Sequence, residues 1–180
     1  MSPRSEHHKN NLAYSGRERV LENARLSALY SLGILDTEPE HRVQRLADRA
    51  ARAFRTPMAA IGFVDRDRVW LKAAVGVPVS EVPRGISFCT HTVHVGSLLV
   101  VPDASMDARF ATHPLVTGDP HIRFYAGAPL RAASGHCVGA LCVLDTVPRT
   151  LEAFDRQYLE QMAGFVSDEL MVRRFVHETC

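Results

Sequence analysis

The sequence predicts an α+β fold: a central antiparallel β-sheet with helices from both ends of the chain on one face, and pocket-forming loops and short helices on the other. Apolar residues recur at three- and four-residue spacing near both ends, which is typical of amphipathic helices. Between these segments, short apolar runs alternate with turn residues, which is typical of strands joined in hairpins. Together these patterns indicate the α+β class.

Length and composition favour one domain without a membrane or nucleic-acid partner. The chain has 180 residues and a formal net charge of +1, which gives no electrostatic reason to expect nucleic acid or an anionic membrane surface. No apolar run approaches the ~20 residues that span a bilayer, and residues 1–11 lack the apolar core of a secretory signal. We therefore expect a cytoplasmic protein, with a disordered tail over 1–16, a single domain over 17–175 and a short tail over 176–180.

Two helices are expected to open the domain. Residues 17–32 carry apolar side chains at helical spacing, and Gly33 is well placed to end this helix. Thr37 and Glu40 fit a capping box for the second helix, with Pro39 in its first turn. The expected inner face of the second helix consists of Val43, Leu46, Ala47, Ala50, Ala53 and Phe54.

Strands dominate the middle of the chain. Residues 58–64 form a continuous apolar run and 69–75 return after a turn, so the two runs predict a hairpin. Ser87 is a candidate cap for a short helix. The remaining elements expected here are a loop over 76–85, a helix over 87–95, a strand over 98–101, a long loop over 103–120 that is functional or partly helical, and a hairpin of strands 123–131 and 136–145.

A long helix over 151–175 is expected to close the domain. Its predicted apolar stripe consists of Leu151, Phe154, Tyr158, Leu159, Met162, Phe165, Val166 and Leu170. Met171, Val172 and Phe175 extend this stripe past what one domain needs to cover, which indicates a helix–helix dimer.

The stretch from Pro83 to Pro129 holds more Asp, Arg, His and aromatic residues than a plain core needs. Such residues on loops that cover a sheet indicate a small-molecule pocket. Strand alternation separates Tyr125 from its neighbour Phe124, and we expect the face of Arg123 and Tyr125 to point into the pocket. On the same grounds, the small residues Gly127 and Gly139 would leave room for a ligand. The expected ligand-binding residues are Phe88, Cys89, His91, Asp103, Arg109, Phe110, Arg123 and Tyr125.

Several of these residues have a structural alternative. Arg109 either binds an anionic group or pairs with Asp103 or Asp107 to hold the long loop, and Arg123 has the same two options. Asp103 either caps the following turn or accepts hydrogen bonds from a ligand. His91 and His94 with Cys89 have a spacing that hints at a transition-metal site, but no second cluster completes it, so we expect no metal.

The four cysteines are Cys89, Cys137, Cys142 and Cys180, and none forms a Cys-x-x-Cys pair. Free thiols are the base expectation for an intracellular chain. The odd separation of Cys137 and Cys142 on one strand predicts that they lie on opposite faces of the sheet. Cys180 is the last residue, where a functional thiol is not expected.

Eight ordered motifs carry a resemblance to a known family. They begin with 35–40 (LDTEPE), 63–65 (FVD) and 70–72 (WLK), and continue with 87–91 (SFCTH), 101–103 (VPD) and 107–110 (DARF). The last two are 123–130 (RFYAGAPL) and 139–145 (GALCVLD). In this order they resemble the GAF family of sensory domains, in the bacterial signalling subtype found ahead of histidine kinases and diguanylate cyclases. The resemblance covers about residues 26–172 and implies a GAF/PAS-like fold.

The resemblance narrows the function without naming a ligand or cofactor. Free methionine-R-sulfoxide reductases of this family use cysteines in the segment corresponding to 104–124, where this chain has none. The Cys-His dipeptide that holds bilins and the Asn-Lys-x-x-x-Phe-Asp-Glu motif of cyclic-nucleotide members are also absent from the sequence. We therefore expect a non-catalytic, stand-alone sensory domain that binds a small molecule and signals through a homodimer or a separate protein such as a kinase or cyclase.

Three alternatives stay open at this point. The domain is a redox sensor through Cys89, a thiol reductase of the methionine-sulfoxide type, or a ligand-free scaffold for dimerisation. The reductase needs a second cysteine beside Cys89 in space. The scaffold needs bulky side chains that close the space beside Arg123.

Overall fold

The expected α+β architecture is present in the computed structural model, which describes residues 15–177, and the backbone alone over 171–177. The helices are α1 (Gly16–Tyr30), α2 (His41–Phe54), α3 (Phe88–Val95), α4 (Pro114–Thr117) and α5 (Ala153–His177), with a 3-10 turn η1 at Arg84–Ile86. The strands are β1 (Met58–Val64), β2 (Arg68–Val75), β3 (Glu81–Pro83), β4 (Leu99–Val101), β5 (Phe124–Arg131) and β6 (Cys137–Asp145).

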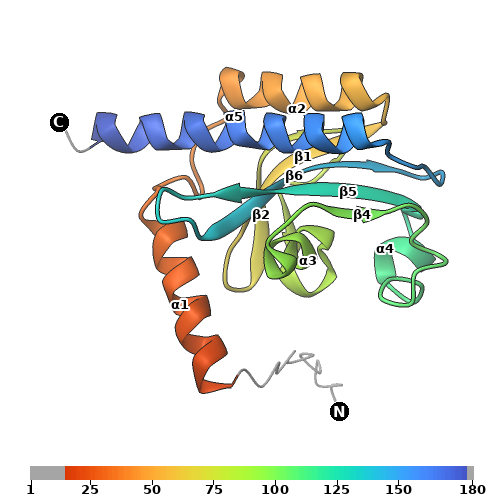
Figure 1. Cartoon of the computed structure of the whole chain (residues 1–180), viewed down its shortest axis with the longest axis horizontal. Helices are drawn as coiled ribbons and strands as arrows, with labels where there is room; N and C mark the ends of the chain where they lie inside the picture. The colour runs from red at the N-terminus through yellow and green to blue at the C-terminus, as the bar shows by residue number, and fades with distance from the viewer. Residues whose placement is uncertain (1–14, 178–180) are drawn as a thin grey trace, which may run out of the picture.

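The six strands form one antiparallel sheet in the order β3-β2-β1-β6-β5-β4. Helices α2 and α5 lie side by side on one face, and α3 and α4 lie on the other (Figure 1). Every residue of the central strand β1 is buried, because both faces of the sheet are covered. The predicted loop over 103–120 is partly helical, since it contains α4, whereas the short edge strand β3 was not predicted.

The alternation of strand β5 divides the interior into two cores. Phe124, Ala126 and Ala128 belong to the core beneath α2 and α5. Tyr125 belongs to the second core, with Phe88 on the α3 side of the sheet. The predicted division of faces along this strand is therefore confirmed, and the second core is the one that faces the loops.

Helix α1 differs from the prediction in how much of it is covered. Its first turns project away from the sheet, and Val20 and Leu21 are 68% and 57% exposed although they continue the apolar stripe (Figure 1). The helix begins at Gly16, inside the predicted tail, because the Ser15 and Glu18 side chains each accept a hydrogen bond from the other's backbone N–H. This capping box was missed in the sequence, and the rest of the predicted tail, 1–14, lies outside the described residues.

The predicted capping box of α2 is wrong. The N-cap residue is Glu40, and it makes no side-chain cap hydrogen bond. The Thr37 hydroxyl instead donates to the Ile34 carbonyl and accepts from Lys72 Nζ at 2.6 Å. Lys72 is a buried cation, and its ammonium also forms an ion pair with Glu40 at 2.6 Å. Because a buried charge needs compensating partners, this segment is organised around Lys72 rather than around the helix end.

Two of the expected apolar faces are also narrower than predicted. Ala53 is exposed although it was placed on the inner face of α2. On α5, Phe154 and Phe165 are 75% and 58% exposed, whereas Leu159, Met162, Val166 and Leu170 are buried. The predicted extension of this stripe over Met171, Val172 and Phe175 lies outside the described side chains. Within 15–177, no helix has a segment of the length and apolarity that crossing a bilayer requires.

Candidate functional site: a cavity above a pair of thiols

A cavity of about 260 Å³ lies on the α3 side of the sheet. Strands β1, β2, β5 and β6 form its floor, the start of α3 forms one wall, and segments 76–82 and 115–122 cover it. Its lining is mainly apolar, with polar groups from Ser87, Asp119 and Tyr125. Ala60, Phe88, Cys89, Tyr125, Cys142 and Leu144 are among its lining residues.

Two buried thiols lie side by side in the wall of this cavity. The Sγ atoms of Cys89, on α3, and Cys142, on β6, are 3.7 Å apart, and the side chains are 5% and 2% exposed. Both are free cysteines in this structure. The sequence separates them by 53 positions, so their contact depends on the packing of α3 onto the sheet.

The two thiols have unequal proton affinity. The pKa of Cys89 is lowered, mainly by its hydrogen bond with the Cys142 thiol. Burial acts in the opposite direction, and hydrogen bonds with the Tyr125 and Ser87 side chains lower this pKa further. The same hydrogen bond, together with burial, raises the pKa of Cys142. Cys89 also lies in the first turn of α3, where backbone N–H groups favour a negative charge. Of the two thiols, Cys89 is therefore the one that gives up its proton more readily.

Tyr125 fills the space that the sequence assigned to a ligand. Its hydroxyl forms a 2.6 Å hydrogen bond with the Thr92 hydroxyl, and a Cβ added at Gly127 would lie 2.1 Å from the same hydroxyl oxygen. The space beside Gly139 is likewise filled, because a Cβ there would lie 2.2 Å from the Gly62 carbonyl oxygen. The expectation that these two glycines leave room for a ligand is therefore wrong: they admit a tyrosine ring and a neighbouring strand.

An aromatic cluster adjoins the cavity. Phe88 stacks on Phe110 with ring centroids 4.7 Å apart and on Tyr125 at 5.1 Å. His91 and His113 contact the rings of this cluster from its outer side. Burial lowers the pKa of both histidines, and the charges of Arg109 and His94 lower that of His91 further, which favours the neutral form of both imidazoles.

The family model described as GAF domain matches residues 38–170 of the chain. The chain belongs to the GAF domain family. The resemblance expected from the eight motifs is thereby confirmed. A relative from Pseudomonas aeruginosa, named cyclic di-GMP phosphodiesterase PA2567, is 38% identical over 146 residues, which are 81% of this chain and 25% of that protein. The GAF chain thus spans about a quarter of the length of this relative.

Solved structures agree with the fold of this GAF domain. A free methionine-R-sulfoxide reductase from Neisseria meningitidis in complex with its substrate has a TM-score of 0.64 at 17% identity, and the match covers 91% of this chain and 95% of that one. The GAF domain of an Acinetobacter phosphoenolpyruvate-protein phosphotransferase has a TM-score of 0.61 at 16% identity, covering 87% and 94%. At such identities the likeness shows the shared fold alone.

Three of the predicted site residues line the cavity of the GAF domain, and five do not. Phe88, Cys89 and Tyr125 are in its wall. Phe110 is fully buried behind Phe88, and His91 packs edge-on against the Phe110 ring at 4.8 Å. The structure thus gathers the aromatic residues and the thiol, and leaves the charged residues outside.

The three charged residues make local structural bonds. Arg109 forms an exposed bidentate pair with Asp107, with Nη2 at 2.6 Å from a carboxylate oxygen. Asp103 accepts hydrogen bonds from the backbone N–H and the hydroxyl of Ser105, as expected for a turn cap. Arg123 Nη1 donates to the carbonyls of Val116 and Ile122. Arg109 and Asp103 thus make the contacts of their structural alternatives, whereas the hydrogen bonds of Arg123 go to backbone carbonyls and not to the expected aspartates.

Cys137 departs from the expected alternation. A bulge in the pairing of β5 with β6 pairs Arg131 with Cys137 and Leu130 with Gly139. Val138 therefore joins the helix-side core, and Cys137 lies beside Gly96 at the end of α3, on the same side of the sheet as Cys142. No cluster of three or more His, Cys, Asp or Glu residues suited to a metal ion occurs in the described part of the chain.

The apolar lining of the cavity was missed in the sequence. Met58 and Ala60 of β1 and Leu144 of β6 were assigned to the sheet without a role in binding. A signal was present in the continuous apolar run 58–64, since a strand covered on both faces also presents every second side chain to the loop side.

Proposed function

We propose that this GAF domain is a non-catalytic regulatory module that binds a small, largely apolar molecule in the cavity on the α3 side of the sheet. The observation that carries the proposal is the cavity itself, which combines apolar walls with a few convergent polar groups, as ligand pockets do. Apolar walls favour an uncharged ligand, because a buried charge would need a buried partner, and the charged lining residue Asp119 is exposed. Ser87, Asp119 and Tyr125 are the groups that would orient it.

The uncharged dye Prodan is a suitable probe for this proposal. We expect Leu144→Trp to weaken Prodan binding about tenfold, because the larger side chain at the half-buried cavity rim takes up ligand space. Fluorescence titration measures the change in affinity. Ala60→Leu, which fills the cavity from its floor, serves as a second variant should the tryptophan alter the rim.

Leu98→Trp is the matched control for this experiment. Leu98 is also half-buried, but it packs against the helix-side core and does not line the cavity. It should therefore leave Prodan affinity unchanged. Equal binding by wild type, both cavity variants and the control would place the dye elsewhere and overturn the proposal, and it would leave the scaffold as the better description of the domain.

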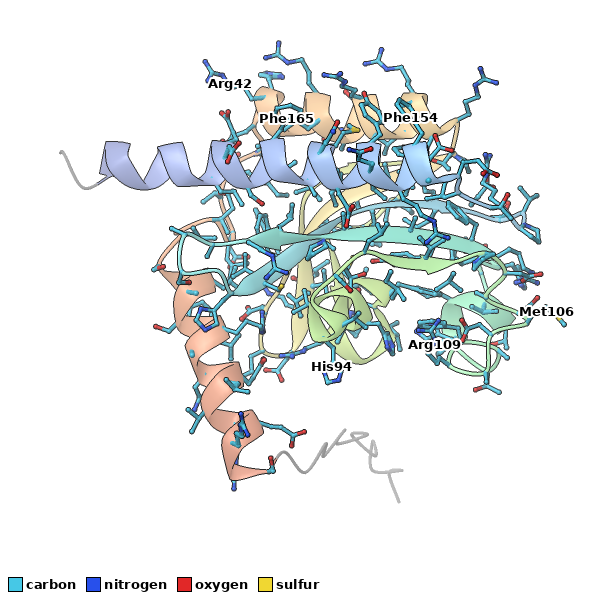
Figure 2. All side chains as sticks on the ribbon, viewed as in Figure 1. Arg42, His94, Met106, Arg109, Phe154 and Phe165 are labelled. Carbon is cyan, nitrogen blue, oxygen red and sulfur yellow. The ribbon has the colours of Figure 1, made fainter. Side chains whose placement is uncertain are left out.

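The output of the module is proposed to pass through α5 to a second copy of the chain. Phe154, Tyr158, Gln161 and Phe165 follow one another at spacings of four, three and four residues, which is the spacing of a helix–helix seam. Phe154 and Phe165 are exposed and point to the same side of α5 (Figure 2). The stripe itself contains no charged residue, and the Arg49 guanidinium that borders it donates to the Tyr158 hydroxyl at 3.2 Å.

We expect the double variant Phe154→Glu/Phe165→Glu to shift the protein from dimer to monomer in sedimentation equilibrium, because like charges would face each other across the seam. Met106→Glu/Val95→Glu is the control, since these two apolar side chains are as exposed but lie away from α5. A wild-type protein that is monomeric at every concentration tested would contradict the seam.

The relative named as a cyclic di-GMP phosphodiesterase supports a regulatory output. The match covers a quarter of that protein, so we propose that such a domain adjusts the activity of an enzymatic partner instead of performing the reaction. Among the described residues, the one arrangement that favours chemistry within the domain is the contact between Cys89 and Cys142.

A further inference from the structure

The contact between the Cys89 and Cys142 thiols is not explained by the proposed ligand binding. Cysteine is common in protein cores as a small apolar side chain, and most buried thiols are inert. Here, however, two thiols touch each other and both face the cavity. A small molecule in the cavity would therefore reach both sulfurs at once, although bulk solvent reaches neither freely.

We propose that Cys89 and Cys142 are a redox pair that forms a reversible disulfide when an uncharged peroxide enters the cavity, and that the disulfide alters what the cavity binds. The first part stands on the thiol geometry alone, and the second part rests on the proposed function. An uncharged hydroperoxide suits the site because the walls around the sulfurs are apolar.

The reaction begins at Cys89. Its thiolate sulfur attacks one oxygen of the peroxide ROOH, so that an S–O bond forms, the O–O bond breaks, and the alkoxide leaves and takes up a proton to give the alcohol ROH. Two electrons pass from sulfur to the peroxide, which leaves Cys89 as a sulfenic acid. The hydrogen bond between the two thiols, which favours the charged form of Cys89, prepares this step.

Cys142 completes the reaction. Its sulfur attacks the sulfenic sulfur, the S–S bond forms, the S–O bond breaks, and the departing hydroxide leaves as water with the Cys142 proton. The sum is two thiols and one peroxide giving one disulfide, one alcohol and one water. The sulfurs must approach from 3.7 Å to the bonded distance of about 2.05 Å, which side-chain rotation and a small shift of α3 supply.

The disulfide would change the cavity because its two ends belong to different walls. Cys89 is on α3 and Cys142 is on the central strand β6. The bond would hold the start of α3 against the sheet, and Phe88, the neighbour of Cys89, lines the same space. We therefore expect the oxidised domain to bind Prodan about tenfold more weakly than the reduced one.

The test uses the full chain with Cys137→Ser and Cys180→Ser, which leaves the pair as its only cysteines. After treatment with tert-butyl hydroperoxide, denaturation and maleimide labelling, we expect both thiols to be lost together. Peptide mapping should give a Cys89–Cys142 crosslink that dithiothreitol reverses. Persistence of both thiols under peroxide that oxidises the exposed cysteine of a short peptide would overturn the proposal, as would crosslinks between chains.

Single variants separate the two steps. Cys142→Ser should stop the reaction at a sulfenic acid on Cys89 that dimedone traps, whereas Cys89→Ser should leave Cys142 unoxidised. Alanine replacements, checked by circular dichroism, repeat the test should either serine destabilise its buried site. Dimedone capture at Cys142 instead of Cys89 would reverse the assignment of nucleophile and contradict the mechanism.

Prodan titration distinguishes failure of this inference from failure of the proposed function. Binding by the reduced protein without disulfide formation refutes the redox pair alone. A disulfide in a protein that never binds Prodan refutes the ligand-binding function alone. Equal Prodan affinity before and after disulfide formation refutes the coupling between them.

Discussion

Replacing Gly139 with alanine is expected to destabilise the GAF domain by about 3 kcal/mol or more. Gly139 pairs with Phe63 in the ladder between the central strands β1 and β6. A Cβ at this position would lie 2.2 Å from the Gly62 carbonyl oxygen and 3.2 Å from the Phe63 Cα, so backbone atoms of a buried strand would have to move. Urea unfolding followed by circular dichroism measures the loss as a lower midpoint at an unchanged slope.

Gly164→Ala is the matched control, because the chemical change is the same and the surroundings are open. Gly164 is exposed on α5, and nothing lies within 4 Å of an added Cβ. Alanine favours the helix by roughly 0.5–1 kcal/mol relative to glycine, so this variant should be slightly more stable than wild type. Equal midpoints for the two variants would mean that β1 and β6 approach each other less closely than described.

The position of Gly139 in the structure also shows which features of this fold could not be predicted from the sequence. Alternation along β5 assigned Phe124 and Tyr125 to opposite faces, and Ser87 was recognised as the cap of α3, where its hydroxyl accepts from the Cys89 N–H. These features depend on neighbours in the sequence. Whether a glycine leaves an open space depends on which distant group approaches it, and at Gly127 and Gly139 the space was already taken.

The candidate site was also predicted only in part, because its aromatic and thiol residues were expected correctly and its arginines were not. Phe88, Cys89 and Tyr125 were expected at the pocket and line it, because aromatic and thiol residues on the loop side of a sheet gather by burial. The arginines were expected there too, but Arg109 and Arg123 find partners within a few residues, as an ion pair and as donors to carbonyls. A sequence does not show whether an arginine binds a ligand or a nearby protein group.

Phe110→Ala is expected to cost about 3–5 kcal/mol of stability, because Phe110 is fully buried and the surrounding rings cannot fill the volume it leaves. The ring stacks on Phe88 and packs against the rings of His91 and His113, so its removal also loses three aromatic contacts. Urea unfolding gives the stability change. Prodan affinity, measured at a temperature where the variant is folded, should remain within a few-fold of wild type because Phe110 does not line the cavity.

Arg109→Ala is the comparison variant for Phe110→Ala. Arg109 is half-exposed, and its pair with Asp107 and its contact with the Phe110 ring are surface interactions, so the variant should lose no more than about 1 kcal/mol. Both residues were predicted from the sequence as ligand contacts, and the two measurements separate that role from a structural one. If Phe110→Ala kept its unfolding midpoint but lost Prodan binding, the ligand would contact Phe110 directly, and the binding site would extend beyond Phe88 into the aromatic cluster.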